Sequence, residues 1–190
     1  MKGTLPLTLV EEKSTVDREA RQASLFEEIV LQYRRPLVAL AFRMLNNLED
    51  ARDQAQEAFI RFWKMKSWPP EAEEVVAVLN RITVNLCIDK LRKLRRFRLF
   101  QSGAQAVISQ HASSDNADRA VLEREMTILI QAAVARLKPR QKAVFVLRDV
   151  EGYSVRETAQ ILSCAENNVL VNLHLARKNL KKWLTPYLKE

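Results

Sequence analysis

The chain has 190 residues with 31 basic and 23 acidic side chains, a net charge of +8, and it contains only 3 glycines and 2 cysteines. Globular proteins average about 7% glycine, so this chain lacks the turn residues that a sandwich or barrel of many short strands requires. No apolar run approaches the roughly 18 residues of a membrane span, and two cysteines without metal-ligand spacing are typical of a reducing compartment. The composition therefore predicts a mostly helical, cytoplasmic protein without membrane insertion, bound metal or cofactor.

The positive charge lies in two blocks rather than along the whole chain. Residues 81–100 carry 7 basic and 1 acidic side chain, and residues 136–190 carry 11 basic and 5 acidic ones, so each block has a net charge of +6. Residues 1–80 and residues 101–135 each have a net charge of −2. Two separated basic blocks predict two contacts with a polyanion, most simply a nucleic acid.

The stretch from Gln101 to Asp118, between the two blocks, contains no lysine or arginine and is rich in serine, alanine, glutamine and asparagine. Such a composition buries little surface, and it predicts a flexible linker between two helical modules. We therefore expect an all-α protein whose second module contains a helix-turn-helix. The expected division is an N-terminal extension at residues 1–24, a first module at 25–98, a linker at 99–118 and a second module at 119–190.

Apolar side chains at three- and four-residue steps predict a first helix over residues 26–45, which Pro36 bends or breaks. Asn46 and Asn47 are a stop signal, and a second apolar stripe follows up to Trp63. A solvated helix face is the simpler interpretation of the polar side of this second helix, and a surface for a partner protein is the alternative. The polar side carries Asp50, Asp53, Gln54 and Glu57.

A third amphipathic helix is predicted from about Val75 through Leu94. Cations on its polar face suit phosphates, asparagine and arginine can bond base edges, and Phe97 offers a ring on which an unpaired base can stack. The face therefore predicts nucleic-acid binding, with a merely solvated charged face as the alternative. Its five aligned residues, spaced to share one side of a helix, are Arg81, Asn85, Asp89, Arg92 and Arg96.

The second module contains several local signals for helix ends. Pro139 suits the first position of a helix, where its missing N–H costs nothing, and Gly152 is a natural helix stop. Residues 154–157 form a capping box that starts another helix. A tight turn at 163–165 then leads into a last helix over about 166–184, and two helices joined in this way predict a helix-turn-helix.

In a helix-turn-helix, the second helix enters the major groove with its N-terminal residues on base edges. A plain helical hairpin is the alternative interpretation. The candidates for base contact are Asn167, Asn168, Leu170, Val171, Asn172 and His174, and those for phosphate contact are Arg177, Lys178 and Lys181.

Three sets of residues resemble bacterial sigma factors of the extracytoplasmic-function (ECF) group. Residues 49–63 resemble the segment that binds core polymerase, and residues 79–92 resemble the helix that melts the promoter and recognises its minus-ten element. Residues 137–148, 151–162 and 173–180 resemble the minus-thirty-five module. The resemblance covers about residues 25–98 and 120–184 in the order that the family has them.

The resemblance implies an alternative sigma factor that binds core RNA polymerase at the beta-prime clamp and beta flap. Such a protein directs the polymerase to specific promoters and assists promoter opening, and it is not itself an enzyme. It also implies an anti-sigma factor as a partner. The implied polymerase-binding residues are Asp50, Asp53, Gln56, Glu57 and Phe59. The implied minus-ten residues are Trp68, which would capture an unstacked base, with Asn80, Arg81, Asn85, Asp89, Arg92, Lys93 and Arg96. The implied minus-thirty-five residues are Asn167, Asn168, Leu170, Val171, Asn172, His174, Arg177 and Lys178.

The recognition helix departs from the family pattern. Its usual sequence is Thr-Val-Lys-Ser-Arg-Leu-His-Arg-Ala-Arg, but residues 168–177 have Leu170, Val171, Asn172 and Leu175 in place of a lysine, a serine and two arginines. The change predicts fewer phosphate contacts and more apolar ones, either to thymine methyl groups or to another protein.

Two further hypotheses remain open from the residues alone. A stand-alone helix-turn-helix regulator would bind duplex DNA without polymerase, but it leaves the acidic face around Asp53 unexplained. A helical nucleic-acid enzyme could bind a metal through acid pairs such as Asp50 and Asp53, but such pairs are common on solvated helices.

Overall fold

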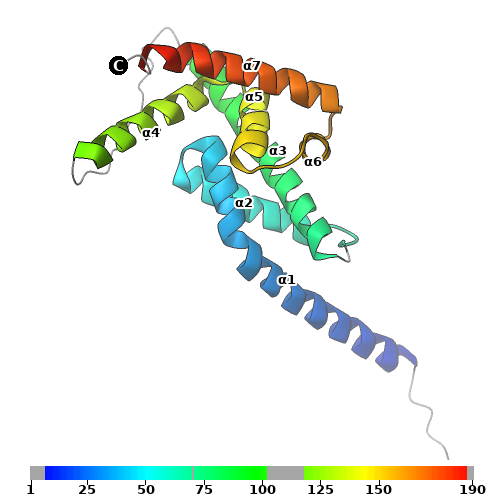
Figure 1. Ribbon diagram of the computed structural model, residues 1–190. Helices are drawn as coiled ribbons and strands as arrows, with labels where there is room; N and C mark the ends of the chain where they lie inside the picture. Colours follow the sequence, from blue (N-terminus) through cyan, green and yellow to red (C-terminus); the bar gives the residue numbers. More distant parts are fainter. Residues whose placement is uncertain (1–6, 70, 102–117, 188–190) are drawn as a thin grey trace, which may run out of the picture.

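The structure is a computed structural model that describes residues 7–69, 71–101 and 118–187 (Figure 1). All regular elements in these ranges are helices, which confirms the all-α prediction. The first part contains α1 (Leu7–Leu45), α2 (Leu48–Trp63) and α3 (Ala72–Gln101). The second contains α4 (Asp118–Arg136), α5 (Pro139–Phe145), η1 (Val146–Val150), α6 (Val155–Ile161), α7 (Glu166–Leu184) and η2 (Thr185–Tyr187). Most of the expected linker lies outside the described residues.

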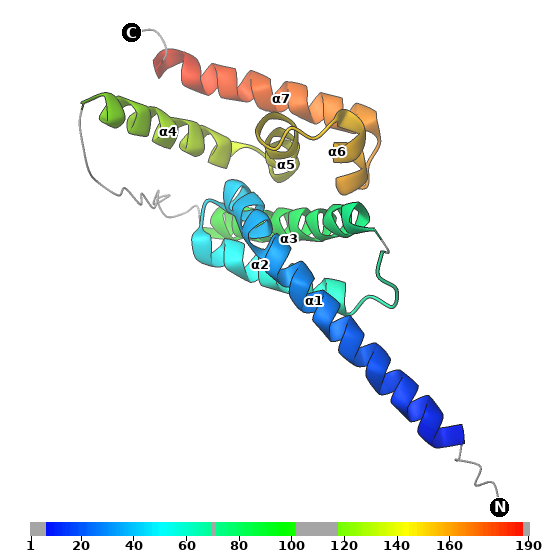
Figure 2. The same cartoon turned by 60° about the horizontal axis from the view of Figure 1, so that its bottom comes forward.

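Helix α1 is longer than the sequence predicts. It begins at Leu7, inside the expected N-terminal extension, and Figures 1 and 2 both show its N-terminal half projecting from the other helices. Of the bend or break predicted at Pro36, the break is wrong, since the helix continues to Leu45. Leu37 and Leu40, which follow the proline, are 2% and 4% exposed. The free energy gained by burying these two side chains outweighs the cost of the hydrogen bond that the proline cannot donate, so the helix continues.

The boundary between α1 and α2 follows from two asparagines. Asn46 adopts the left-handed conformation with φ of 54°, which asparagine tolerates better than most residues. The Asn47 side chain then accepts a hydrogen bond from the backbone N–H of Asp50 at 2.9 Å and caps α2. The predicted stop signal is confirmed.

The second module has the helix ends that its sequence predicts. Pro139 is the first residue of α5, and Gly152 has a φ of 81°, which favours glycine. Ser154 and Glu157 cap each other reciprocally at the start of α6. The π-helical turn η1 is a feature that the sequence did not predict, and it is closed by a hydrogen bond from the Glu151 N–H to the Val146 carbonyl at 2.9 Å.

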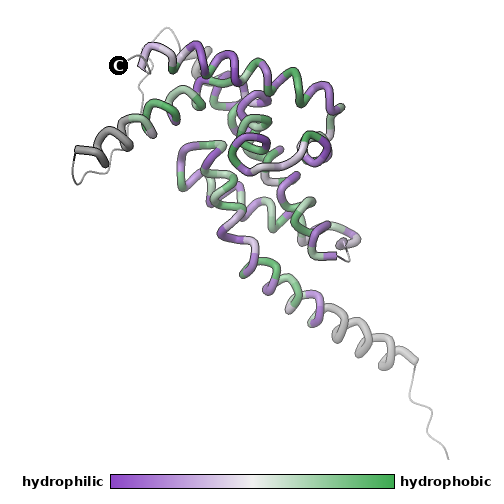
Figure 3. The backbone as a smooth tube through the Cα atoms, in the orientation of Figure 1, coloured by the Kyte–Doolittle hydropathy of each residue, from purple (hydrophilic) through white to green (hydrophobic). Residues whose placement is uncertain are grey.

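One hydrophobic cluster contains residues of both modules, and two others lie within a single module each. Figure 2 shows the helices of the second module lying over α3, whose other side faces α1 and α2. In Figure 3, hydrophobic and hydrophilic residues alternate along α7, as expected for a helix with one buried side. The first module contributes Leu40, Ala41, Met44, Ala51, Val84, Cys87 and Ile88 to the shared cluster. The second contributes Ala143, Val144, Val146, Leu147, Ala159, Ile161, Leu162, Val169 and Leu173.

Within the described ranges, no helix combines the length and the apolar character needed to cross a membrane.

Candidate nucleic-acid and protein interfaces

The acidic side of α2 is only partly available to a partner. Asp53 and Gln56 are exposed, whereas Asp50 forms an ion pair with Lys90 of α3 at 2.7 Å. Glu57 pairs with Arg61 one turn later at 2.8 Å, and both side chains are about half exposed. The surface therefore combines free acceptors with an acid that is tied to the neighbouring helix.

Phe59 does not belong to this surface. Its side chain is 7% exposed, and its ring meets Phe26 of α1 edge to face at 6.3 Å between centroids. In this arrangement the residue holds α2 against α1 and cannot be presented to polymerase. The apolar stripe that contains it, Ala51, Ala55, Ala58, Phe59 and Phe62, is buried throughout.

The polar face of α3 is exposed along its length. All five residues that the spacing places on one side of the helix are exposed, and so is Lys93. Asp89 forms an ion pair with Arg92 at 3.1 Å, and Phe97 is 60% exposed beside these cations. Long cations and an exposed ring on one helix face can contact the phosphates and bases of a nucleic-acid strand.

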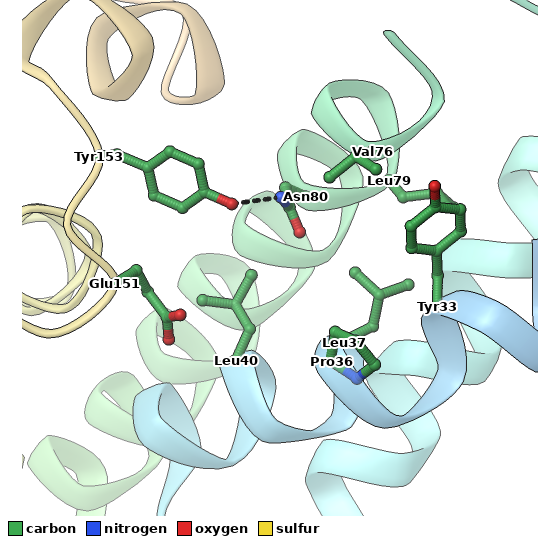
Figure 4. Close-up of a pocket in the computed structure, with 9 residues that line it drawn as sticks. All are labelled: Tyr33, Pro36, Leu37, Leu40, Val76, Leu79, Asn80, Glu151 and Tyr153. Atoms are coloured by element: carbon green, nitrogen blue, oxygen red, sulfur yellow. Dashed lines mark hydrogen bonds between the residues drawn. The ribbon is translucent and has the colours of Figure 1, made fainter. Parts of the chain in front are cut away.

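Asn80 lies on a different side of α3 from this basic face. Its side chain is 7% exposed, and its Nδ2 donates a hydrogen bond to Oη of Tyr153, from the second module, at 2.7 Å (Figure 4). Burial, and then the carboxylates of Glu151 and Glu157, raise the pKa of Tyr153, so the phenol stays protonated. Asn80 is therefore engaged by the second module and not available to DNA in this arrangement.

A second polar contact lies close to the Asn80 bond. Arg43 of α1 forms an ion pair with Glu151 at 2.8 Å, and the backbone carbonyl of Tyr153 accepts a hydrogen bond from Arg148. A small cavity of about 160 Å³ lies between the modules here. Its lining, drawn in Figure 4, is Tyr33, Pro36, Leu37, Leu40, Val76, Leu79, Asn80, Glu151 and Tyr153.

Trp68 faces the interior of the first module. Its ring packs against Phe62 at 5.0 Å, Trp63 at 5.5 Å and Phe26 at 5.9 Å between centroids. Its indole N–H is buried without a hydrogen-bond acceptor. The indole is thus part of an aromatic cluster, and its side chain is only partly exposed.

Helix α7 has a buried side and a mixed outer side. Four residues at steps of three and four pack inward, namely Val169, Leu173, Ala176 and Leu180. Asn167, Asn168 and His174 are exposed, and Asn172 is half-buried, with its Nδ2 donating to the Asn168 carbonyl at 2.7 Å. Lys178 is exposed in the second half of the helix. The outward positions are those that a helix-turn-helix would present to a groove.

Arg177 forms a bidentate ion pair within the second module. Its Nε and Nη2 donate to the two carboxylate oxygens of Asp149 at 2.9 and 2.6 Å. These hydrogen bonds raise the pKa of Arg177 above its ordinary value. The pair connects α7 to η1, and sequence reasoning, which assigned Arg177 to phosphate, did not find it because Asp149 is 28 residues away.

Sequence reasoning also missed Tyr153, Glu151, Arg43 and Lys90, the residues of the contacts between elements. Among the described side chains, no group of three or more histidine, cysteine, aspartate or glutamate residues is arranged to hold a metal ion.

Comparison with known families defines the class of the protein. Residues 29–97 match the family description "Sigma-70 region 2", and residues 127–180 match "Sigma-70, region 4". The two matches fall on α1–α3 and on α4–α7, and they define a sigma factor of the sigma-70 class.

Individual relatives narrow the assignment. The ECF RNA polymerase sigma factor SigM of Mycobacterium tuberculosis is 30% identical over 159 residues, which are 84% of this chain and 76% of the relative. The ECF RNA polymerase sigma factor SigE of Mycolicibacterium smegmatis is also 30% identical, over 166 residues that cover 87% of this chain and 63% of the relative. The chain belongs to the ECF RNA polymerase sigma factors.

The arrangement of helices has a counterpart among solved structures. The sigma factor RpoE of Bartonella quintana, solved in complex with the anti-sigma factor NepR, has a TM-score of 0.61 with 21% sequence identity. The alignment covers 84% of this chain and 96% of that one. At this identity the likeness concerns the fold.

Proposed function

We propose that this chain binds core RNA polymerase and directs it to promoters with two separate elements, acting in the cytoplasm as a specificity subunit and not as an enzyme. The observation that supports this proposal most is the pairing of an acidic face on α2 with a cationic face on α3. One small module thereby offers one surface to a protein and another to DNA, and the second module adds a helix-turn-helix.

The proposed polymerase-docking surface is centred on Asp53, Gln56 and Glu57. Asp50 joins it at its edge, where its carboxylate also holds Lys90 of α3 at 2.7 Å. Phe59 supports the surface from inside the module. Exposed acids on one helix complement a basic partner surface, which favours fast and specific association.

The proposed minus-ten surface is the exposed face of α3. Arg81, Arg92 and Arg96, with Lys93, would contact phosphates, while Asn85 and Asp89 can exchange hydrogen bonds with base edges. Asn80 can join them only after it leaves Tyr153, because its amide is bonded there at 2.7 Å. A base that stacks on Trp68 would have to compete with the neighbouring rings of its aromatic cluster.

The proposed minus-thirty-five surface is the outer side of α7, where Lys178 can reach phosphates. Arg177 is paired with Asp149, so this carboxylate competes with phosphate for its guanidinium. We also propose an anti-sigma protein as a partner, because the fold resembles that of a sigma factor solved with one bound.

The proposal is tested by mixing the purified full chain with core RNA polymerase. We expect co-purification and run-off transcription from promoters mapped after overexpression in cells. The double variant Asp53→Lys with Gln56→Lys should lose co-purification, whereas Glu73→Lys, which reverses an exposed acid in the first turn of α3, should retain it. Duplex binding without any association with core enzyme would favour a stand-alone regulator and refute the proposal.

A further inference from the structure

The outer side of α7 is apolar at several positions where a groove-reading helix would present side chains. Leu170, Val171 and Leu175 are 51%, 49% and 39% exposed. They flank the line of Asn167, His174 and Lys178 on the side of the helix opposite Val169 and Leu173. Exposing three branched apolar side chains to water is unfavourable. We therefore expect a binding partner to cover them.

The cations near these residues are not placed to read bases. Arg177 is bidentate to Asp149 in η1, so two of its N–H groups are used within its own module, although the arginine side chain is 59% exposed. Lys178, Lys181 and Lys182 are exposed in the second half of α7, beyond the residues that would enter a groove first. The first half therefore offers no arginine or lysine for O6 and N7 of guanine, the commonest specific contact in the major groove.

The remaining chemistry fits A·T base pairs. The C5-methyl group of thymine is the one apolar feature in the major groove, and aliphatic side chains contact it. Asparagine can bond N6 and N7 of adenine, and the exposed amides of Asn167 and Asn168 lie beside the apolar side chains.

Charge favours duplex DNA over a protein as the occupant of this face. Residues 136–190 have a net charge of +6, and the exposed lysines continue along the same helix. The apolar side chains are also interrupted by the polar side chains of Asn167 and His174, whereas the fully buried core of a protein interface is more apolar than the rest of the surface. Methyl contacts surrounded by amides and flanked by cations match the composition of a DNA groove and its phosphates.

We propose that α7 reads A·T pairs in the upstream promoter element, with Leu170, Val171 and Leu175 contacting thymine methyl groups and Asn167 and Asn168 bonding adenine. This inference rests on the proposed function, because it assumes that α7 lies in the major groove of a promoter. It identifies these apolar residues as determinants of promoter specificity.

The test uses holoenzyme reconstituted from core RNA polymerase and the full chain. Duplex promoters randomised over the upstream element are selected by binding, and A·T pairs should be enriched. Each thymine of the selected element is then replaced by deoxyuridine, which removes only the methyl group. Each contacted methyl should account for about a fourfold change in affinity.

Variants assign the methyl contacts to side chains. Val171→Ala should reduce the difference in affinity between thymine and deoxyuridine promoters at one position of the element. Leu175→Arg should shift the selected sequences towards guanine. Ile128→Ala, at a residue 44% exposed on α4, is the matched control and should change neither.

The outcomes separate the inference from the proposed function. A holoenzyme that transcribes but binds thymine and deoxyuridine equally, or selects guanine or no upstream sequence, overturns the inference and leaves the proposed function intact. Unchanged selection by the Val171 and Leu175 variants would indicate that this face meets a protein instead, and would also overturn it. Failure to associate with core polymerase refutes the proposed function itself.

Discussion

Tyr153→Phe removes one hydroxyl from the contact between the two modules. The ring stays in place, but Nδ2 of Asn80 loses the acceptor that it reaches at 2.7 Å. The Asn80 side chain is 7% exposed and lines a small cavity together with Tyr153, so water can replace that acceptor only in part. A buried donor left without a partner costs about 1–2 kcal/mol, which is roughly a 5- to 30-fold change in an equilibrium constant.

The loss should appear in two measurements. The free energy of unfolding in urea should fall by about 1–2 kcal/mol with an unchanged slope. Because Asn80 must leave Tyr153 to contact DNA, the affinity for a single-stranded minus-ten oligonucleotide should rise, by about fivefold if the cost is ~1 kcal/mol. Anisotropy of a labelled oligonucleotide measures the second effect.

A double-mutant cycle with Asn80→Ala isolates the contact. The coupling free energy between the two positions should be about 0.5–1.5 kcal/mol, and Tyr187→Phe, at a tyrosine 57% exposed, should change nothing. A coupling below about 0.3 kcal/mol would refute the reasoning, because it would mean that the two side chains are not bonded in solution.

Three other substitutions test local features. Ser154→Ala removes the cap of α6 and should lower the free energy of unfolding by about 1 kcal/mol, measured in urea. Asp149→Asn should release Arg177 and strengthen binding to random duplex DNA. The slope of affinity against salt, measured by anisotropy between 50 and 200 mM salt, should increase by about one phosphate contact. Burial raises the pKa of the Cys87 thiol to about 12, above its ordinary value of 9.0. As the pH rises from 9 towards 12, the free energy of unfolding should therefore fall more for the unmodified chain than for Cys87→Ala. Urea unfolding of both chains measures this difference.

Each of these predictions has a result that contradicts it. Equal stability of Ser154→Ala and the unmodified chain would mean that the capping box is not formed. An unchanged salt dependence of Asp149→Asn would show that Arg177 does not reach phosphate. For Cys87, the protonated thiol is favoured in the folded chain, so its stabilising contribution is complete below pH 9 and is lost above it. A constant difference from Cys87→Ala across that range would contradict the burial argument.

Features set by neighbouring residues could be predicted from the sequence. Three local signals define helix ends where they were expected, namely Pro139, Gly152 and the capping box from Ser154 to Glu157. Each depends only on residues within four positions of it in the chain. The shared exposed face of α3 follows from helical periodicity in the same way. Such signals need no knowledge of distant parts of the chain.

Contacts between distant residues could not be predicted in this way. Asn80 and Tyr153 are 73 positions apart, and Arg177 and Asp149 are 28 apart, so no local rule pairs them. One signal for Asn80 was nevertheless present. It precedes Val84 by four residues and Cys87 by seven, and both of these are completely buried, so Asn80 belongs to an inward stripe.

The core cluster that joins both modules also affects synthesis of the chain. Val84, Cys87 and Ile88 are translated well before Val144 and Leu147, which complete the same cluster. While the ribosome makes the intervening residues, this part of the first module lacks the side chains that finally cover it. A nascent chain that stops before α5 therefore leaves apolar surface open to water, which makes truncated products targets for chaperones and proteases.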